Sequence, residues 1–163
     1  MILGMTLFQF TVLHTALSVI GILTGLLVLQ RMVRMRPLGA SNNIFLLSTI
    51  LTSASGFFFP IVRIGPAHIV GVVSLVALAA AAAALWVGNL YGFWRGVYVV
   101  SITLALWLNI VVGIIQVFRK FAPLHRLAPN GNEPILLAAQ AAAFLFVAGL
   151  GWLAFKRFHP GGM

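Results

Sequence analysis

Five stretches of this sequence are long, apolar and almost free of charge, and they constrain the fold more than any other feature. They cover residues 7–30, 43–60, 66–89, 97–118 and 134–155. Because a helix rises about 1.5 Å per residue, about 20 apolar residues cross a hydrocarbon core of roughly 30 Å. We therefore predict an all-α integral membrane protein. Residues 1–163 are expected to form one domain, a bundle of five transmembrane helices joined by short loops.

The composition favours the same class. Of the 163 residues, 62% are hydrophobic and only 7% are charged, which is too few to cover the surface of a soluble domain. The net charge is +9, but the cations lie between the apolar stretches instead of clustering on one face. This spread argues against a nucleic-acid partner. The expected partner of these cations is a bilayer with anionic headgroups.

The side chains that are missing exclude several kinds of chemistry. The chain has no cysteine, so disulfides and thiolate metal sites are excluded. Glu133 is the single acidic side chain, so catalysis by paired carboxylates or by an Asp-backed triad is excluded as well. We therefore expect a protein that is not an enzyme, and we predict no catalytic residue.

The second stretch, residues 43–60, is shorter and more polar than the others. Its hydroxyl groups can bond within the helix, so they do not forbid membrane insertion. Residues 41–43, Ser-Asn-Asn, are suitable N-cap residues for this helix. If the stretch did not cross the membrane, the bundle would have four spans.

Small residues mark the faces on which helices are expected to pack. In the first stretch, Ser18, Gly21 and Gly25 follow His14 on one helical face. Glycines four residues apart let another helix approach closely. In the second stretch, Gly56 continues a ridge of small residues. We predict that these positions serve helix packing.

Polar side chains are predicted to gather in one half of the bundle, on the outer side of the membrane. Such groups are costly against lipid, so they are expected to face the interior and find partners there. The candidates for a ligand or cofactor site are His14, Ser53, Ser55, His68, Asn109, Gln116, Gln140 and Arg63. All five helices contribute to this set. The inner half is predicted to be nearly free of polar side chains, with only Thr24, Ser101 and Thr103.

Three functions fit such a cluster. The first is a hydrogen-bond network that fixes helix packing in a non-catalytic accessory or assembly component of a larger membrane complex, or in a homo-oligomer. The second is a cofactor or ligand site, in which His14 and His68 bind b-type haem, with Arg63 near a propionate, or a quinone. No other metal site is predicted, and the two histidines differ in depth by roughly 8 Å, which argues against haem. The third is a small transporter or channel, which needs a polar route through the inner half.

Several segments resemble those of small multi-pass inner-membrane proteins of bacteria that are usually described as uncharacterised. The segments are His14–Ser18, Thr52–Pro60, Gly65–His68 and Leu106–Asn109 with Gln116. The resemblance covers most of the chain and implies a bacterial inner-membrane protein, without an activity.

The cations predict an orientation. Six lie at one end of the predicted bundle: Arg31, Arg34, Arg36, Arg95, Lys156 and Arg157. Four lie at the other: Arg63, Arg119, Lys120 and Arg126. Because the cytoplasmic side carries the excess of Lys and Arg, we expect the N-terminus outside and the C-terminus in the cytoplasm. The first span lacks a preceding basic region and is expected to be retained.

Overall fold

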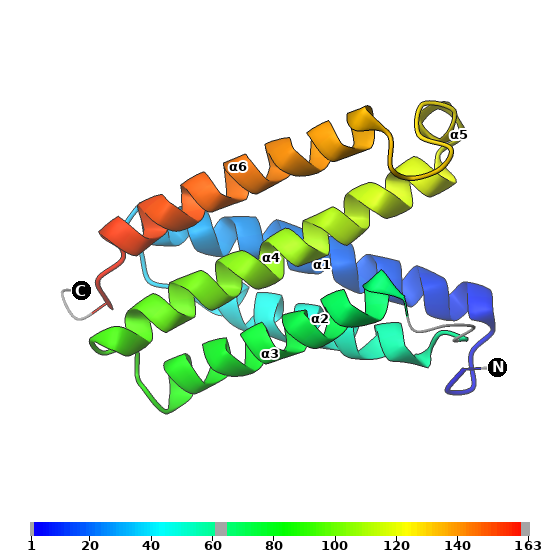
Figure 1. The fold of residues 1–163 in the computed structure, drawn as a ribbon. Helices are drawn as coiled ribbons and strands as arrows, with labels where there is room; N and C mark the ends of the chain where they lie inside the picture. The colour runs from blue at the N-terminus through cyan, green and yellow to red at the C-terminus, as the bar shows by residue number, and fades with distance from the viewer. Residues whose placement is uncertain (1, 61–64, 161–163) are drawn as a thin grey trace.

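The computed structural model describes residues 2–60 and 65–160, and within them the regular elements are helices (Figure 1). They are α1 (Leu7–Val33), α2 (Ala40–Ser55), the short 3₁₀ turn η1 (Gly56–Phe58), α3 (Pro66–Trp86), α4 (Phe93–Lys120), α5 (Ala122–His125) and α6 (Pro134–Arg157). The predicted all-α class is confirmed for this part of the chain.

The long helices alternate in direction. Figure 1 shows α1, α3 and α6 running one way along the bundle, and α2 and α4 running the other way. One end of the bundle therefore holds the start of α1, the end of α2, the start of α3 and the whole of α5. We call it the N-terminal end. The opposite end, where α6 finishes, is called the C-terminal end.

Four helices in the described residues are long and apolar enough to cross a membrane: α1, α3 over His68–Trp86, α4 and α6. Helix α2 has 16 residues and is shorter than these four. It packs against α1, α3 and α4, while α6 packs against α1 and α4.

The predicted helix boundaries are corrected at several places. Helix α1 continues to Val33, and α2 ends at Ser55 instead of residue 60. Helix α2 begins at Ala40 after Gly39, whose φ is +64°, and no side chain caps it, so the predicted capping role of residues 41–43 is wrong. Helix α3 ends at Trp86 instead of residue 89, because Asn89 and Leu90 have positive φ angles and leave the helical conformation. Helix α4 begins four residues earlier than predicted, at Phe93.

The buried core of the C-terminal end contains a polar pair that the sequence did not lead us to expect there. Asn42 is buried against α4, where its Oδ1 accepts a hydrogen bond from the hydroxyl of the fully buried Tyr98. Ser101, which was expected in this half, is also buried on α4. The prediction of an almost bare inner half is therefore wrong, because Asn42 was assigned to a cap instead of the core.

Helix α1 packs closely on α2 and α4 through two glycines. A Cβ added to Gly21 would lie 2.8 Å from Thr49 Oγ1 and 3.0 Å from Asn109 Nδ2. A Cβ on Gly25 would lie 2.8 Å from both the Phe45 ring and Leu106 Cδ1. Only glycine fits these contacts without displacement of a neighbour.

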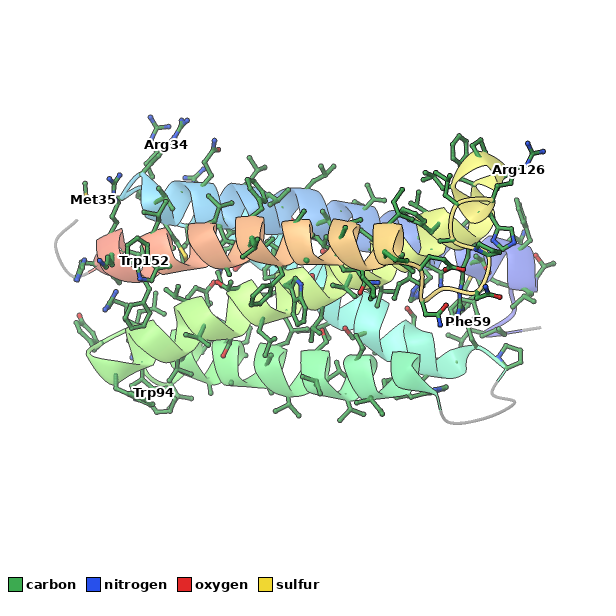
Figure 2. The ribbon with its side chains drawn as sticks, turned by 45° about the horizontal axis from the view of Figure 1, so that its top comes forward. Arg34, Met35, Phe59, Trp94, Arg126 and Trp152 are labelled. Atoms are coloured by element: carbon green, nitrogen blue, oxygen red, sulfur yellow. The ribbon has the colours of Figure 1, made fainter. Side chains whose placement is uncertain are left out.

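The outward faces of the helices are apolar between charged ends. Large exposed hydrophobic side chains occur along α1, α2, α3, α4 and α6; examples are Val19, Leu23, Leu47, Val72, Val76, Val100, Leu145 and Phe146. In Figure 2 such side chains project outward along the bundle, while Arg34 and Arg126 mark opposite ends. This surface is the reverse of that of a soluble helical bundle, which hides its apolar stripes.

Candidate ligand cavity

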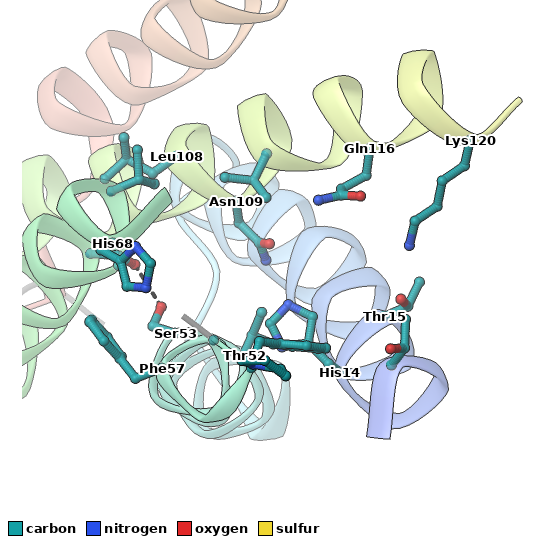
Figure 3. A pocket seen from close by; sticks show the side chains of 18 of the residues that line it. His14, Thr15, Thr52, Ser53, Phe57, His68, Leu108, Asn109, Gln116 and Lys120 are labelled. Carbon is teal, nitrogen blue, oxygen red and sulfur yellow. Dashed lines mark hydrogen bonds between the residues drawn. The ribbon is translucent and has the colours of Figure 1, made fainter. Parts of the chain in front are cut away.

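A cavity of about 620 Å³ opens at the N-terminal end of the bundle (Figure 3). Residues of α1, α2, η1, α3 and α4 line it. Part of its wall is apolar and aromatic, formed by Leu7, Phe57, Phe59, Pro60, Val70, Leu108 and Val112. The polar part comprises Thr11, His14, Thr15, Thr52, Ser53, His68, Ser74, Asn109, Gln116 and Lys120.

His14 enters the cavity from the second turn of α1 and is held by α2. Its Nδ1 lies 2.8 Å from Ser55 Oγ, and Ser55 Oγ donates to the Thr52 carbonyl at 3.1 Å. Because the Ser55 proton is used there, the hydrogen-bond network assigns the imidazole proton to Nδ1, which donates to Ser55. The Nε2 atom of neutral His14 is then an acceptor. The ring packs edge-on against Phe59, with centroids 5.2 Å apart.

His68 has the opposite tautomer. It is the third residue of α3, and its side chain turns back to the helix start, where the Gly65 N–H donates to Nδ1 at 3.2 Å. This bond assigns the proton of neutral His68 to Nε2. The two histidines of the cavity therefore differ: His14 offers a lone pair at Nε2, and His68 offers an N–H.

Three polar residues of α4 share one face along the cavity. Asn109, Gln116 and Lys120 are spaced by seven and four residues, which places them on the same side of a helix. Asn109 is used for packing, since Ser18 Oγ donates to its Oδ1 at 2.7 Å and its Nδ2 donates to the Ser18 carbonyl at 3.2 Å.

Gln116 and Lys120 differ from the buried Asn109, because both are exposed and neither side chain has a hydrogen-bond partner among the described residues. Figure 3 shows both extending from α4 toward α1, with Thr15 on the facing side. Their amide and ammonium groups are therefore the donors that the cavity leaves available.

One further bond joins the cavity walls. Ser53 on α2 donates to Ser74 on α3, with the oxygens 3.0 Å apart. Together with the His14–Ser55 and Ser18–Asn109 bonds, it ties α2 to α3, α1 to α2 and α1 to α4. Part of the polar cluster thus holds the helices together.

The structure brings most of the predicted site residues to one place. His14, Ser53, His68, Asn109 and Gln116 line the cavity, and Ser55 supports His14 from behind. The expectation that all five helices contribute is wrong, because Gln140 lies on α6, which packs on α1 and α4 and does not reach the cavity. Arg63 lies outside the described residues.

Sequence reasoning missed Lys120 and Ser74 as lining residues. Lys120 was treated only as a cation flanking a span, although it lies four residues after Gln116 and so shares its face. Ser74 follows His68 by six residues, which turns it about 120° away around the helix. Helical spacing from a known polar residue could therefore have found Lys120 but not Ser74.

Metal binding has little support in the described residues. They contain no group of three or more His, Cys, Asp or Glu side chains that could hold an ion. Haem iron bound by two histidines would need a lone pair at both Nε2 atoms, and the assigned tautomer of His68 carries a proton there.

Comparison with protein-family models, with curated proteins and with solved structures finds no match to this chain. The function is therefore argued from the cavity itself.

Proposed function

We propose that this chain is a multi-pass membrane protein that binds a lipid-soluble small molecule in the cavity at its N-terminal end. The main support for this proposal is the cavity itself. It has the volume and the mostly apolar wall typical of small-molecule sites, with a few polar groups that converge on it.

The surface of the bundle supports the membrane part of the proposal. An apolar belt runs between two ends that carry the cations, as a hydrocarbon core flanked by headgroups requires. Six cations lie toward the C-terminal end. We therefore retain the proposed orientation, with the N-terminus outside a bacterial inner membrane and the C-terminus in the cytoplasm.

The course of the chain favours five spans. Helices α1 and α3 run in the same direction, so the chain has to return between them, and α2 makes that return (Figure 1). Its 16 residues rise about 24 Å, and η1 extends the path by a further turn. The hydroxyl groups of α2 face its helical neighbours, where Ser48, Thr49 and Thr52 are buried.

Cysteine labelling tests the number of spans, and the cysteine-free sequence makes single-cysteine variants simple to interpret. The positions are Leu3, Met35, Tyr91 and Asn132, all exposed. We expect Met35→Cys and Tyr91→Cys to react with a membrane-impermeant maleimide from one side, and Leu3→Cys and Asn132→Cys from the other. Labelling of Met35→Cys and Tyr91→Cys from opposite sides would show that α2 does not cross.

The ligand part of the proposal is supported by groups that the packing does not use. The exposed side chains of Gln116 and Lys120 line the cavity and have no partner among the described residues. One ring nitrogen of each histidine is available as well. The amide, the ammonium and the two ring nitrogens can bind a ligand whose headgroup carries polar atoms.

The cavity does not continue as a polar route to the C-terminal end. Phe45 and Leu106 pack against Gly25 between the cavity and the Asn42–Tyr98 pair. We therefore favour a binding site that opens at one end only over a transport path. The non-catalytic accessory role stays a prediction, since no feature of the described residues tests it.

Native mass spectrometry of protein purified in mild detergent tests for the ligand. We expect a bound small molecule that organic solvent extracts. Val112→Phe, which fills the cavity, should lower its occupancy, whereas Val100→Phe, on the outward face of the same helix, should not. Equal occupancy in the two variants would contradict the proposed site.

A further inference from the structure

We infer that the ligand of this cavity is a quinone, held through its ring oxygens by donors on opposite sides of the cavity. The inference rests on the proposed function and names the class of molecule bound. It follows from the tautomers of two histidines and from the position of Gln116 and Lys120.

The donors of the cavity lie at two separate places. On the α3 side, His68 presents its Nε2–H, because the Gly65 N–H occupies Nδ1. On the α4 side, Gln116 and Lys120 present an amide and an ammonium group toward α1 (Figure 3). A para-quinone carries its two carbonyl acceptors on opposite sides of its ring, so one can accept from the α3 donor and the other from a donor of α4.

Two aromatic side chains that line the cavity suit a flat conjugated ring. Phe57 lies beside His68, with centroids 6.0 Å apart, and Phe59 lies beside His14. Aromatic neighbours favour stacked or edge-on packing of another ring. The isoprenoid chain of a quinone is apolar and can pack against apolar lining residues such as Leu108 and Val112.

His14 adds an acceptor to this arrangement. Its Nε2 is free to accept because Nδ1 donates to Ser55. A quinol hydroxyl can donate to this atom, so the cavity can also hold the reduced form.

Two other ligands fit less well. Haem would require a lone pair where His68 carries a proton. A fatty acid has its acceptor oxygens at one end only, so binding it at Lys120 would leave the His68 N–H unpaired against its alkyl chain, which is costly.

Titration calorimetry with decylubiquinone tests the inference on the full chain in detergent micelles. We expect saturable binding to the wild type. Gln116→Leu removes one hydrogen bond and should weaken binding about fivefold. The matched control is Gln140→Leu, which changes a glutamine outside the cavity and should leave the affinity unchanged. Likewise, His68→Phe should weaken binding about fivefold, while His125→Phe, in a short exposed helix, should not.

Three further probes distinguish the failure of this inference from the failure of the proposed function. Decylbenzene has the same chain without ring oxygens and should bind at least tenfold more weakly; equal affinity would overturn the quinone assignment. Binding of decanoate or haem without binding of decylubiquinone would overturn it too, yet leave a ligand site in place. Absence of binding by all four probes, in protein that circular dichroism shows to be helical, would overturn both.

Discussion

Replacement of Gly21 by alanine is expected to destabilise the bundle, because the added methyl group has no room. It would lie 2.8 Å from Thr49 Oγ1 and 3.0 Å from Asn109 Nδ2, and both side chains are buried. A misfit of this kind costs about 1–3 kcal/mol. Asn109 cannot retreat freely, since it is bonded to Ser18 twice. The helix propensity of alanine offsets part of the cost, by about 1 kcal/mol.

The matched control is Gly149→Ala on α6. Gly149 is exposed within its helix, and an added Cβ meets nothing within 4 Å. Because both variants gain the same helix propensity, the difference between them isolates the packing cost. Unfolding in sodium dodecyl sulfate, followed by circular dichroism, should show Gly21→Ala less stable than Gly149→Ala by about 1–3 kcal/mol. Equal stability of the two variants would refute the close approach of α1 to α2 and α4.

Two further predictions concern polar groups outside the cavity. Tyr98→Phe removes the donor to Asn42 and leaves a buried amide oxygen unpaired, so it should lower the free energy of unfolding by about 1–3 kcal/mol in the same assay. The control is Tyr91→Phe, at a position that is 72% exposed. Equal stability of the two variants would contradict the buried bond. The Glu133 carboxylate accepts hydrogen bonds from the Asn130, Gly131 and Asn132 amides. These bonds hold the pKa of Glu133 below its ordinary value of 4.5, and the bond from the Asn130 amide has the largest effect. The loop should therefore be stabilised above pH 4.5 and lose this support as the pH falls below it. Amide NMR shifts of residues 130–132 should follow this titration in the wild type and not in Glu133→Gln; a titration that persists in the variant would assign it to another group.

The fold was predictable to the extent that hydrophobicity determines it. Four long apolar helices lie where the sequence placed them, because such stretches have few other ways to satisfy their backbone groups in apolar surroundings. The boundaries were less predictable. The end of α3 depends on the left-handed backbone at Asn89 and Leu90. The pair Gly88-Asn89 favours a turn, but Leu90 gives no such signal.

The cavity was predictable only in part, because helical spacing gives a face but not the neighbour that it meets. Polar character singled out His14, His68 and Gln116, and the structure places all three at the cavity. Gln140 has the same polar character, but its position depends on α6 packing against the far side of α4, which no residue of the sequence reveals. The tautomers of the histidines depend on Ser55 and Gly65, and these contacts required the folded chain.

Photocrosslinking tests most directly whether the cavity at the N-terminal end is a binding site. The probe is a benzoquinone with a diazirine on its alkyl chain, and crosslinked peptides are mapped by mass spectrometry. We expect crosslinks within residues 7–15 of α1 and 108–120 of α4, suppressed by excess decylubiquinone. Crosslinks spread over the outward face of α6 and unaffected by the competitor would contradict it.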